Sequence, residues 1–286
     1  MKVRMPGRKW FLDEQYRLGT SPTFAWGLLR DRVVYRQRSG VQRIEIFDNE
    51  AFGRVLALDG LMQLSTRYEH VYHEMLVHPA LLNLEKPRSA LVIGGGDGGA
   101  LRELLKHPLE RAVIVEIDQG VIDMCREYLP GVSAGAFDDP RVEIVIEDAR
   151  GYVERQSAEF DVIVFDATDA YGPSEALWTT EMYRAIQKAL RRGGIGAFQA
   201  GQFTEQYGIQ GRDEIRAVFK HTQIHKAFVA CFPFDECAFI IASDQTRVNR
   251  FELKKIRQRF RSRKLTSAYY DPDMHLGSTL YPRGWR

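Results

Sequence analysis

The sequence predicts an α/β protein in which a mostly parallel sheet, covered by helices, follows a small antiparallel β unit. From residue 88 onward, short apolar runs typical of buried strands alternate with segments of helical composition. Such alternation is typical of a parallel sheet with helices on both faces. Before residue 65, short β-type runs are separated by turn residues, as in antiparallel hairpins. We therefore expect two units, an N-terminal β-strand domain over 1–65 and a larger domain over 66–286.

The N-terminal unit is predicted to consist of hairpins. Four strands are expected, over residues 32–37, 42–47, 54–58 and 61–64. Ser39-Gly40 divides the first pair and Asp59-Gly60 the second, and an Asp-Gly pair between apolar runs is a strong signal for a tight turn. Between residues 65 and 84 the apolar pattern becomes helical, so a helix is expected after this unit.

The second unit is predicted to alternate strands and helices. Strands are expected over 90–93, 112–116, 142–146, 161–165 and 195–199. Helices are expected between them, over 100–107, 119–128, 149–156 and 180–190. Parallel strands bring their carboxyl ends to one edge of the sheet, and ligands of such sheets bind beyond that edge.

A glycine-dense turn from Gly94 to Gly99 joins the first of these strands to its helix. Glycine lets a ligand approach the backbone closely, and the following helix N-terminus presents free N–H groups. Asp97 lies inside the turn, and its carboxylate would repel a phosphate. A cationic ligand is therefore expected beside this turn.

Acidic residues follow each of the first four strands of the second unit. They are Asp97, Glu116 with Asp118, Asp148, and Asp166 with Asp169. We interpret Asp118 as a cap of the next helix and expect the others to form a negative pocket. Glu116 lies 19 residues after Asp97, at the position from which such folds hold a ribose through its hydroxyls. The sequence therefore predicts a cationic, hydroxylated ligand that contains a nucleoside.

Four segments of the second unit carry more specific information: GGGDGGALRELLKH, VEID, DDPRVEIVIEDA and DATDAYGPSEALWT. Together with FGRVLALDGLMQLS and YHEMLVHPALL, they closely resemble the polyamine aminopropyltransferases, of which spermidine synthase is the best known. The resemblance extends from about Gln42 to Gln199, with a weaker echo between Tyr269 and His275.

The resemblance implies a Rossmann-like sheet of the S-adenosylmethionine-methyltransferase type. It also implies transfer of the aminopropyl group of decarboxylated S-adenosylmethionine to an amine, most readily putrescine, with release of methylthioadenosine. The decarboxylated molecule is a co-substrate, so no cofactor and no metal are expected. The expected partners are polyamine and nucleoside substrates and further copies of the chain, in a homodimer or homotetramer.

Matched position by position, the resemblance implies roles for eleven residues. Contacts to the nucleoside substrate are implied for Gln42, Gln63, Glu116, Asp148, Ala149 and Pro173. Contacts to amine groups are implied for Tyr72, His73, Asp97 and Asp169, with Asp97 facing the aminopropyl nitrogen. Asp166 matches the proposed proton acceptor.

One departure from the family bears on the acceptor amine. The segment 231–237, CFPFDEC, stands where familiar members have a proline, a tyrosine and paired glycines. Cadaverine, agmatine and spermidine therefore stay open as acceptors. A methyltransferase that uses intact S-adenosylmethionine would share the sheet, Glu116 and Asp148, but would not need Asp166 and Asp169. A non-catalytic sensor would be expected to lose Asp166.

The composition argues against several other classes of protein. With 40 basic and 38 acidic residues the net charge is +2, so nucleic acid is not an expected partner. No run approaches the roughly 20 apolar residues that span a bilayer, and the three cysteines lack metal-ligand spacing. A soluble, cytoplasmic protein is expected, in which Cys125 belongs to the core and His78 packs or forms hydrogen bonds. Residues 250–264 predict an amphipathic surface helix with a solvated basic face.

Overall fold

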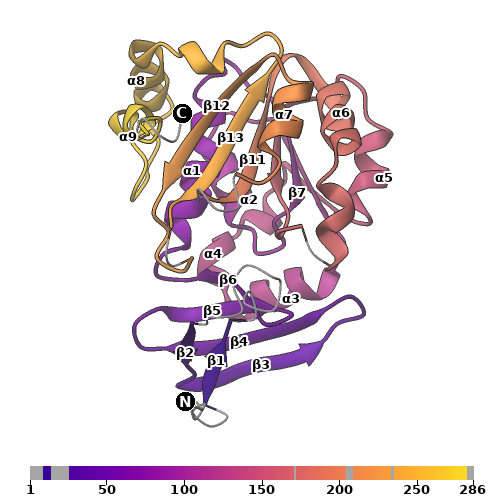
Figure 1. Ribbon diagram of the computed structural model, residues 1–286, viewed down its shortest axis with the longest axis vertical. Helices are drawn as coiled ribbons and strands as arrows, with labels where there is room; N and C mark the ends of the chain where they lie inside the picture. The colour runs from indigo at the N-terminus through magenta and orange to yellow at the C-terminus, as the bar shows by residue number, and fades with distance from the viewer. Residues whose placement is uncertain (1–8, 14–25, 171, 204–208, 233–234, 282–286) are drawn as a thin grey trace.

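Three sheets make up the β structure of the computed structural model (Figure 1), which describes residues 9–13, 26–170, 172–203, 209–232 and 235–281. A two-stranded sheet pairs β1 (Trp10–Leu12) with β2 (Gly27–Leu29). The predicted hairpins form a four-stranded antiparallel sheet of β3 (Arg32–Arg38), β4 (Arg43–Asn49), β5 (Gly53–Leu58) and β6 (Leu61–Ser65). The small N-terminal antiparallel sheet is thus confirmed. The division of the chain into domains over 1–65 and 66–286 stays a prediction.

The third sheet has seven strands in the order β12-β13-β11-β10-β7-β8-β9. Its parallel strands are β7 (Ser89–Gly94), β8 (Arg111–Glu116), β9 (Val142–Ile146), β10 (Phe160–Asp166) and β11 (Leu190–Gln202). From β7 the chain builds outward to β8 and β9, then crosses to β10 on the other side of β7. This reversal creates a switch point at the carboxyl ends of β7 and β10, where α/β sheets bind ligands.

Two strands of this sheet were not predicted. β12 (His221–Ala227) and β13 (Cys237–Ser243) pair antiparallel, and β13 also pairs antiparallel with β11. The prediction relied on helices alternating with strands, whereas these two strands form a hairpin. The mostly parallel Rossmann-like sheet is confirmed, with an antiparallel edge.

Helices cover both faces of the large sheet and build separate cores there (Figure 1). On one face lie α1 (Glu69–Leu81), α2 (Gly99–Leu105) and α8 (Leu253–Ser262); on the other lie α5 (Ala149–Glu154), α6 (Thr180–Ala189) and α7 (Arg212–Val218). In β7, Ala90 and Val92 join the first core, while Leu91 and Ile93 join the second. This alternation follows from the two-residue period of a strand.

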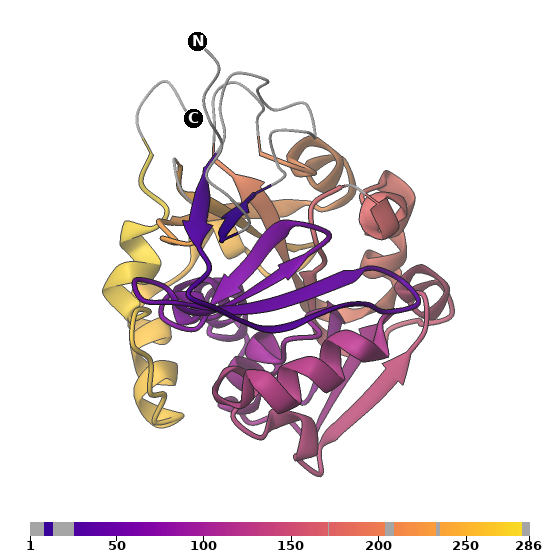
Figure 2. The same ribbon diagram turned by 90° about the horizontal axis from the view of Figure 1, so that it is seen from below.

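A third core joins the N-terminal sheet to α3 (Gln119–Tyr128). Ile44, Ile46 and Leu56 of the sheet pack against Val121 and Cys125 of the helix. Cys125 is therefore a core residue, as predicted. Figure 2 shows the N-terminal strands lying across the helices beneath the large sheet. The short remaining elements are α4 (Pro130–Ser133), η2 (Ala136–Asp138), η3 (Gly172–Leu177), η4 (Val248–Arg250) and α9 (Pro272–Gly277).

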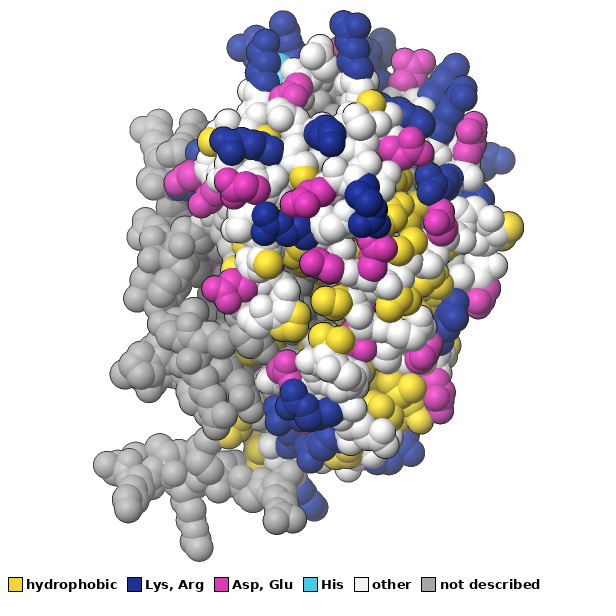
Figure 3. Space-filling view, turned by 90° about the vertical axis from the view of Figure 1, so that its right-hand side faces the viewer, with side chains coloured by type: hydrophobic (Ala, Val, Ile, Leu, Met, Phe, Trp, Pro, Cys, Tyr) yellow, Lys and Arg dark blue, Asp and Glu magenta, His cyan; other side chains and the backbone are white. Residues whose placement is uncertain are grey.

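Charged side chains of both signs are interspersed on the face that Figure 3 displays. Among the described side chains of that face, apolar groups gather in its middle and no basic stripe is formed. This distribution agrees with the near-balanced charge of the sequence.

The predicted basic helix exists as α8, but its basic face is not wholly solvated. Arg263 donates to the backbone oxygens of Leu81 (2.9 Å) and Leu84 (2.6 Å), and Arg259 donates to that of Leu82 (2.8 Å). These carbonyls lie at and just beyond the C-terminus of α1, where a helix has unpaired acceptors and a partial negative charge. The expectation of a solvated face is wrong for these two arginines, which fasten α8 to α1.

Replacing Arg263 by alanine is expected to lower the free energy of unfolding by about 2 kcal/mol, because buried carbonyls lose charged donors. Arg261, an exposed residue of the same helix, provides the matched control. Arg261→Ala should change the unfolding free energy by less than about 0.5 kcal/mol. Urea unfolding followed by circular dichroism measures both, and equal effects would contradict the fastening role.

Candidate active site

A cavity of about 510 Å³ lies where the carboxyl ends of β7, β8 and β10 meet the N-terminal sheet. All eleven residues singled out from the sequence line it, although they come from both predicted units. They are Gln42, Gln63, Tyr72, His73, Asp97, Glu116, Asp148, Ala149, Asp166, Asp169 and Pro173. The acids that follow the four strands therefore line one cavity, as expected. The roles of the individual residues stay predictions.

The glycine-rich turn allows β7 and β10 to end in close contact. Gly94 has φ +77°, and a Cβ atom there would lie 2.6 Å from the backbone oxygen of Asp166. The N–H of Gly95 donates to that same oxygen over 3.1 Å. A side chain at position 94 would therefore separate the two strand ends.

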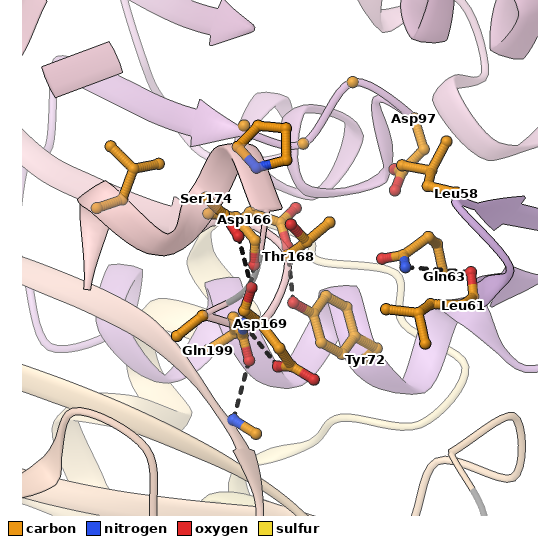
Figure 4. Close-up of a pocket in the computed structure, with 18 of the residues that line it drawn as sticks. Leu58, Leu61, Gln63, Tyr72, Asp97, Asp166, Thr168, Asp169, Ser174 and Gln199 are labelled. Carbon is orange, nitrogen blue, oxygen red and sulfur yellow. Dashed lines mark hydrogen bonds between the residues drawn. The ribbon is translucent and has the colours of Figure 1, made fainter. Parts of the chain in front are cut away.

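Asp166 is the partly buried carboxylate at the end of β10. Its Oδ1 atom accepts a 2.7 Å hydrogen bond from the hydroxyl of Tyr72, drawn in Figure 4. Among the residues that the structure describes, its Oδ2 atom has no hydrogen-bond partner. Burial, with a contribution from the charge of Asp97, raises the pKa of Asp166 to about 6 against the weaker opposing effects of His73 and Tyr72. Asp166 can thus exchange a proton near neutral pH through an oxygen that no described group occupies.

Asp97 faces the same cavity, but its pKa moves the other way. Burial opposes its ionisation; the charge and hydrogen bond of His73 and the N–H of Gly99 outweigh burial and hold the pKa below the ordinary value. The His73 Nε2 atom lies 3.3 Å from Asp97 Oδ1, and Gly99 N lies 2.6 Å from that oxygen. Asp97 is thus ionised in the pH range where its neighbour Asp166 titrates, an arrangement that suits them to different chemical tasks.

The loop after Asp166 is held by side chains that the sequence did not single out. Gln199, at the end of the predicted strand 195–199, donates to the backbone oxygen of Ala167 (2.8 Å) and to Asp169 Oδ1 (3.4 Å). The hydroxyl of Ser174 donates to the backbone oxygen of Asp169 over 2.5 Å (Figure 4). Burial raises the pKa of Asp169. Gln199 follows the same strand-end rule as the acids, but it was missed because only acids were considered.

Glu116 occupies another part of the cavity, and it is almost fully buried. Its Oε1 atom accepts from the N–H of Asp118 over 3.0 Å, and a Cβ on Gly96 would lie 2.9 Å from its Oε2 atom. Burial is the largest cause that raises the pKa of Glu116 to about 7, and the nearby charge of Asp118 adds to it. A buried carboxylate with unused lone pairs suits a ligand that donates two hydroxyl hydrogen bonds.

The N-terminal sheet supplies one wall of the cavity. Gln42 Nε2 donates to Asp118 Oδ2 over 3.0 Å, which orients the glutamine, and Gln63 Nε2 donates to the Leu61 backbone oxygen over 3.2 Å. Asp118 also accepts from the N–H of Gly120 at the start of α3, so its interpretation as a helix cap is confirmed.

Asp148 and Pro173 lie at the exposed mouth of the cavity, and Ala149 is buried beside Asp148. Asp148 also caps α5, since its Oδ1 atom accepts from the N–H of Arg150 over 3.0 Å. It therefore has a structural task in addition to any contact with a ligand.

One further residue that lines the cavity was missed at the sequence level. Asp13 lines the cavity from the end of β1, and its Oδ2 atom accepts from the N–H of Met62 over 2.9 Å. The segment 231–237, where the sequence differs from the family pattern, also reaches the cavity through Phe232 and Cys237. The centre of the Phe232 ring lies 6.0 Å from that of the Tyr72 ring. Pro233 and Phe234 of that segment lie outside the described residues.

His78 is buried away from the cavity and hydrogen-bonded, as predicted, with its Nδ1 atom 3.0 Å from His107 Nε2. Within the described ranges, no group of three or more histidine, cysteine or acidic side chains is placed to hold a metal ion. None of the helices in the described part of the chain has the length and apolar character needed to cross a membrane.

Two family models match the chain. The spermine/spermidine synthase domain matches residues 69–252, and the spermidine synthase tetramerisation domain matches residues 10–66. Among curated proteins, the polyamine aminopropyltransferase of Pectobacterium carotovorum subsp. carotovorum is 40% identical over 88% of this chain and 89% of the relative. That of Erwinia tasmaniensis is 38% identical over 88% of this chain and 90% of the relative.

Solved structures agree with these matches. A spermidine synthase in complex with the transition-state analogue AdoDATO superimposes with a TM-score of 0.89 and 32% identity, over 99% of this chain and 96% of the other. The spermidine synthase from Thermotoga maritima gives a TM-score of 0.88 and 33% identity, over 99% of this chain and 95% of the other.

The raised pKa of Glu116 predicts how the stability of the unliganded protein changes with pH. Its pKa is higher in the folded state, about 7, than the ordinary value of 4.5, so its stabilising contribution is complete below 4.5 and is lost as pH rises to 7. Relative to Glu116→Gln, the wild type should lose about 3 kcal/mol of unfolding free energy over that range. Denaturant unfolding at several pH values measures this difference.

The exposed residue Glu50 provides the control for this prediction. Glu50→Gln should follow the wild type at every pH. A wild type that gains stability relative to Glu116→Gln as pH rises would contradict the buried, protonated state of Glu116.

Proposed function

The chain belongs to the spermine/spermidine synthase family and is an aminopropyltransferase, and we propose that its acceptor is putrescine and its product spermidine. The proposed donor is decarboxylated S-adenosylmethionine, which leaves as methylthioadenosine. The observation that carries this proposal is the pair of partly buried carboxylates, Asp97 kept ionised and Asp166 able to titrate, in one cavity with Glu116. A relative of this fold solved in complex with AdoDATO supports the choice of donor.

The donor already carries its own activation, because a sulfonium makes the neighbouring carbon electrophilic. The enzyme has to align a neutral amine with that carbon and exclude water. The amine lone pair forms the new C–N bond as the C–S bond breaks, and sulfur keeps the electron pair of the broken bond. The proposed reaction therefore requires no metal ion and no cofactor.

The amine has to lose a proton during this step. A free alkylamine has a pKa near 10.4, so most of the acceptor arrives as the ammonium ion. In the proposed mechanism, Asp166 accepts this proton through its unoccupied Oδ2 atom, and the electron pair left on nitrogen forms the C–N bond. Asp97 and Asp169 hold the nitrogens that do not react, with Asp97 facing the aminopropyl nitrogen of the donor. An anion at Asp97 also disfavours intact S-adenosylmethionine, whose extra carboxylate it repels.

The nucleoside part of the donor is assigned to the other end of the cavity. Glu116 accepts hydrogen bonds from the two ribose hydroxyls, and Asp148 with Ala149 lies at the adenine. Gln42, Gln63 and Pro173 complete this end. Tyr72 and His73 contact the amine part, where Tyr72 also orients Asp166 through its 2.7 Å hydrogen bond.

We assign the oligomer as a homotetramer, because the family model matching residues 10–66 describes a tetramerisation domain. Trp10, Leu29 and Val33 of the two N-terminal sheets are apolar and more than a third exposed. Burial of these side chains between subunits would remove apolar surface from water.

A mass-spectrometric assay tests the proposed function. Purified enzyme is incubated with decarboxylated S-adenosylmethionine and each of putrescine, cadaverine, agmatine and spermidine, with intact S-adenosylmethionine as a parallel donor. Putrescine should gain one aminopropyl unit, with an equal amount of methylthioadenosine formed. Preference for another amine would overturn the acceptor, and methylation from the intact donor would overturn the reaction.

Asp166→Asn is expected to lower kcat by about 100-fold or more, because the proton acceptor of the reaction is removed. Nucleoside binding should change little, since Glu116 binds the ribose independently. Methylthioadenosine affinity by calorimetry and kcat by the mass assay separate the two effects. The exposed Asp123→Asn variant serves as the control. Equal losses of turnover and of nucleoside affinity would refute this division of tasks.

A further inference from the structure

Four charged side chains form a continuous chain beside the cavity. Arg102 of α2 binds Glu69 of α1 through two hydrogen bonds of 2.8 and 3.0 Å. Glu69 Oε2 lies 2.6 Å from His73 Nδ1, and His73 Nε2 lies 3.3 Å from Asp97 Oδ1. Only Asp97 and His73 of the four line the cavity, so Glu69 and Arg102 act from behind.

Both ring nitrogens of His73 face carboxylates. A neutral imidazole donates from one nitrogen only, which would leave a lone pair opposite an anionic oxygen. The doubly protonated ring satisfies both contacts. Burial disfavours this charged form, but Asp97 and Glu69 outweigh burial and raise the pKa of His73 well above 6.5.

The ring of His73 is closely packed on two sides. A Cβ on Gly99 would lie 2.3 Å from the ring, so the α2 backbone is packed directly against it. The Tyr72 ring stands edge-on to it, with the ring centres 5.2 Å apart. The titratable and charged groups that face His73 are Glu69 and Tyr72 from α1, Asp97 from the turn, Arg102 from α2 and Asp166 from β10.

Glu69 is itself immobilised. Its carboxylate is buried and accepts the bidentate contact of Arg102, whose remaining donors bind the backbone oxygen of Val132 (2.5 Å) and Glu103 (2.8 Å). A bidentate guanidinium fixes a carboxylate in both position and charge. Glu69 therefore remains an acceptor aimed at His73 in the absence of any substrate.

The charge on His73 affects both carboxylates of the cavity. It stabilises ionised Asp97, which contacts it directly, and it moderates the rise that burial and Asp97 produce in the pKa of Asp166. Removing that positive charge would leave two like charges sharing one buried site, and the pKa of Asp166 would rise further.

We infer that Glu69, anchored by Arg102, is a positioning residue that keeps His73 as an imidazolium, so that Asp97 stays ionised beside a proton-accepting Asp166. The inference rests on the proposed function for the tasks of the two aspartates. The ionisation state of His73 itself belongs to the unliganded protein and does not depend on the reaction.

The test uses Glu69→Gln, His73→Gln, the double variant, and Glu110→Gln as a control, since Glu110 is exposed and remote from His73. Nuclear magnetic resonance of the His73 ring nitrogens gives its titration midpoint in unliganded enzyme. Rate measurements give the midpoint of the acid limb of kcat/KM, expected near 6 in the wild type.

Glu69→Gln should lower the His73 midpoint by more than about one pH unit and raise the acid-limb midpoint by about half a unit or more. Glu110→Gln should change neither. His73→Gln should raise the acid limb by itself, and adding Glu69→Gln should then shift it no further, because the two residues act through one charge.

An unchanged His73 midpoint in Glu69→Gln would overturn the inference, as would a Glu69→Gln shift that persists undiminished in the His73→Gln background. If Glu69→Gln does not fold, the pH profile of His73→Gln alone decides. An acid limb that is not shifted in His73→Gln contradicts the inference. If no aminopropyl transfer is detected, the resonance titration still decides the state of His73, so failure of the proposed function is recognised separately.

Discussion

Several buried carboxylates share one cavity, and repulsion between them is the constraint around which this structure is arranged. A near-neutral protein concentrates acids at the ends of four parallel strands, where burial favours the neutral forms of Asp97, Glu116 and Asp166. The neighbours of these three carboxylates differ. A buried imidazolium compensates Asp97, the hydroxyl of Tyr72 occupies one oxygen of Asp166, and Glu116 lies apart against the backbone of the glycine turn. Differences in environment, rather than in residue type, thus separate three chemically similar side chains.

Helix α1 carries most of these contacts. Nearly all of its residues are buried, so it is a central helix rather than an amphipathic surface helix. Its first turns supply Glu69, Tyr72 and His73, while Glu74 accepts hydrogen bonds of 2.7–2.8 Å from three consecutive backbone N–H groups, at Ala268, Tyr269 and Tyr270. Arg259 of α8 and Arg263 just after it donate hydrogen bonds to backbone carbonyls at the C-terminal end of α1. The segment that contains Ala268, Tyr269 and Tyr270 is thereby tied to the same helix that presents Tyr72 and His73 to the cavity.

Local patterns were sufficient for the parts of the structure that obey simple periodicity. The Asp59-Gly60 hairpin, the apolar runs of β7 to β10 and the acids that follow them all lie where the pattern predicted. The hairpin of β12 and β13 was missed because it interrupts the alternation of strand and helix. The partners of Arg263 and Arg102 lie 182 and 33 positions away, respectively, and nothing in the spacing of charges indicates which acceptors these side chains reach. The position of Asp13 could not be predicted from the sequence either, because it reaches Met62 and the cavity wall only in the folded chain.

The placement of Gln42 and Gln63 on the N-terminal sheet has a consequence for protein engineering. That sheet reaches the catalytic unit through the apolar contacts of α3 and also forms a wall of the cavity. It cannot be treated as an exchangeable module, because deleting it or grafting a homologous sheet from another protein alters a wall of the cavity as well as the segment that matches a tetramerisation domain. Chimeras designed to change the number of subunits would have to retain these two glutamines and the strand register that aims them.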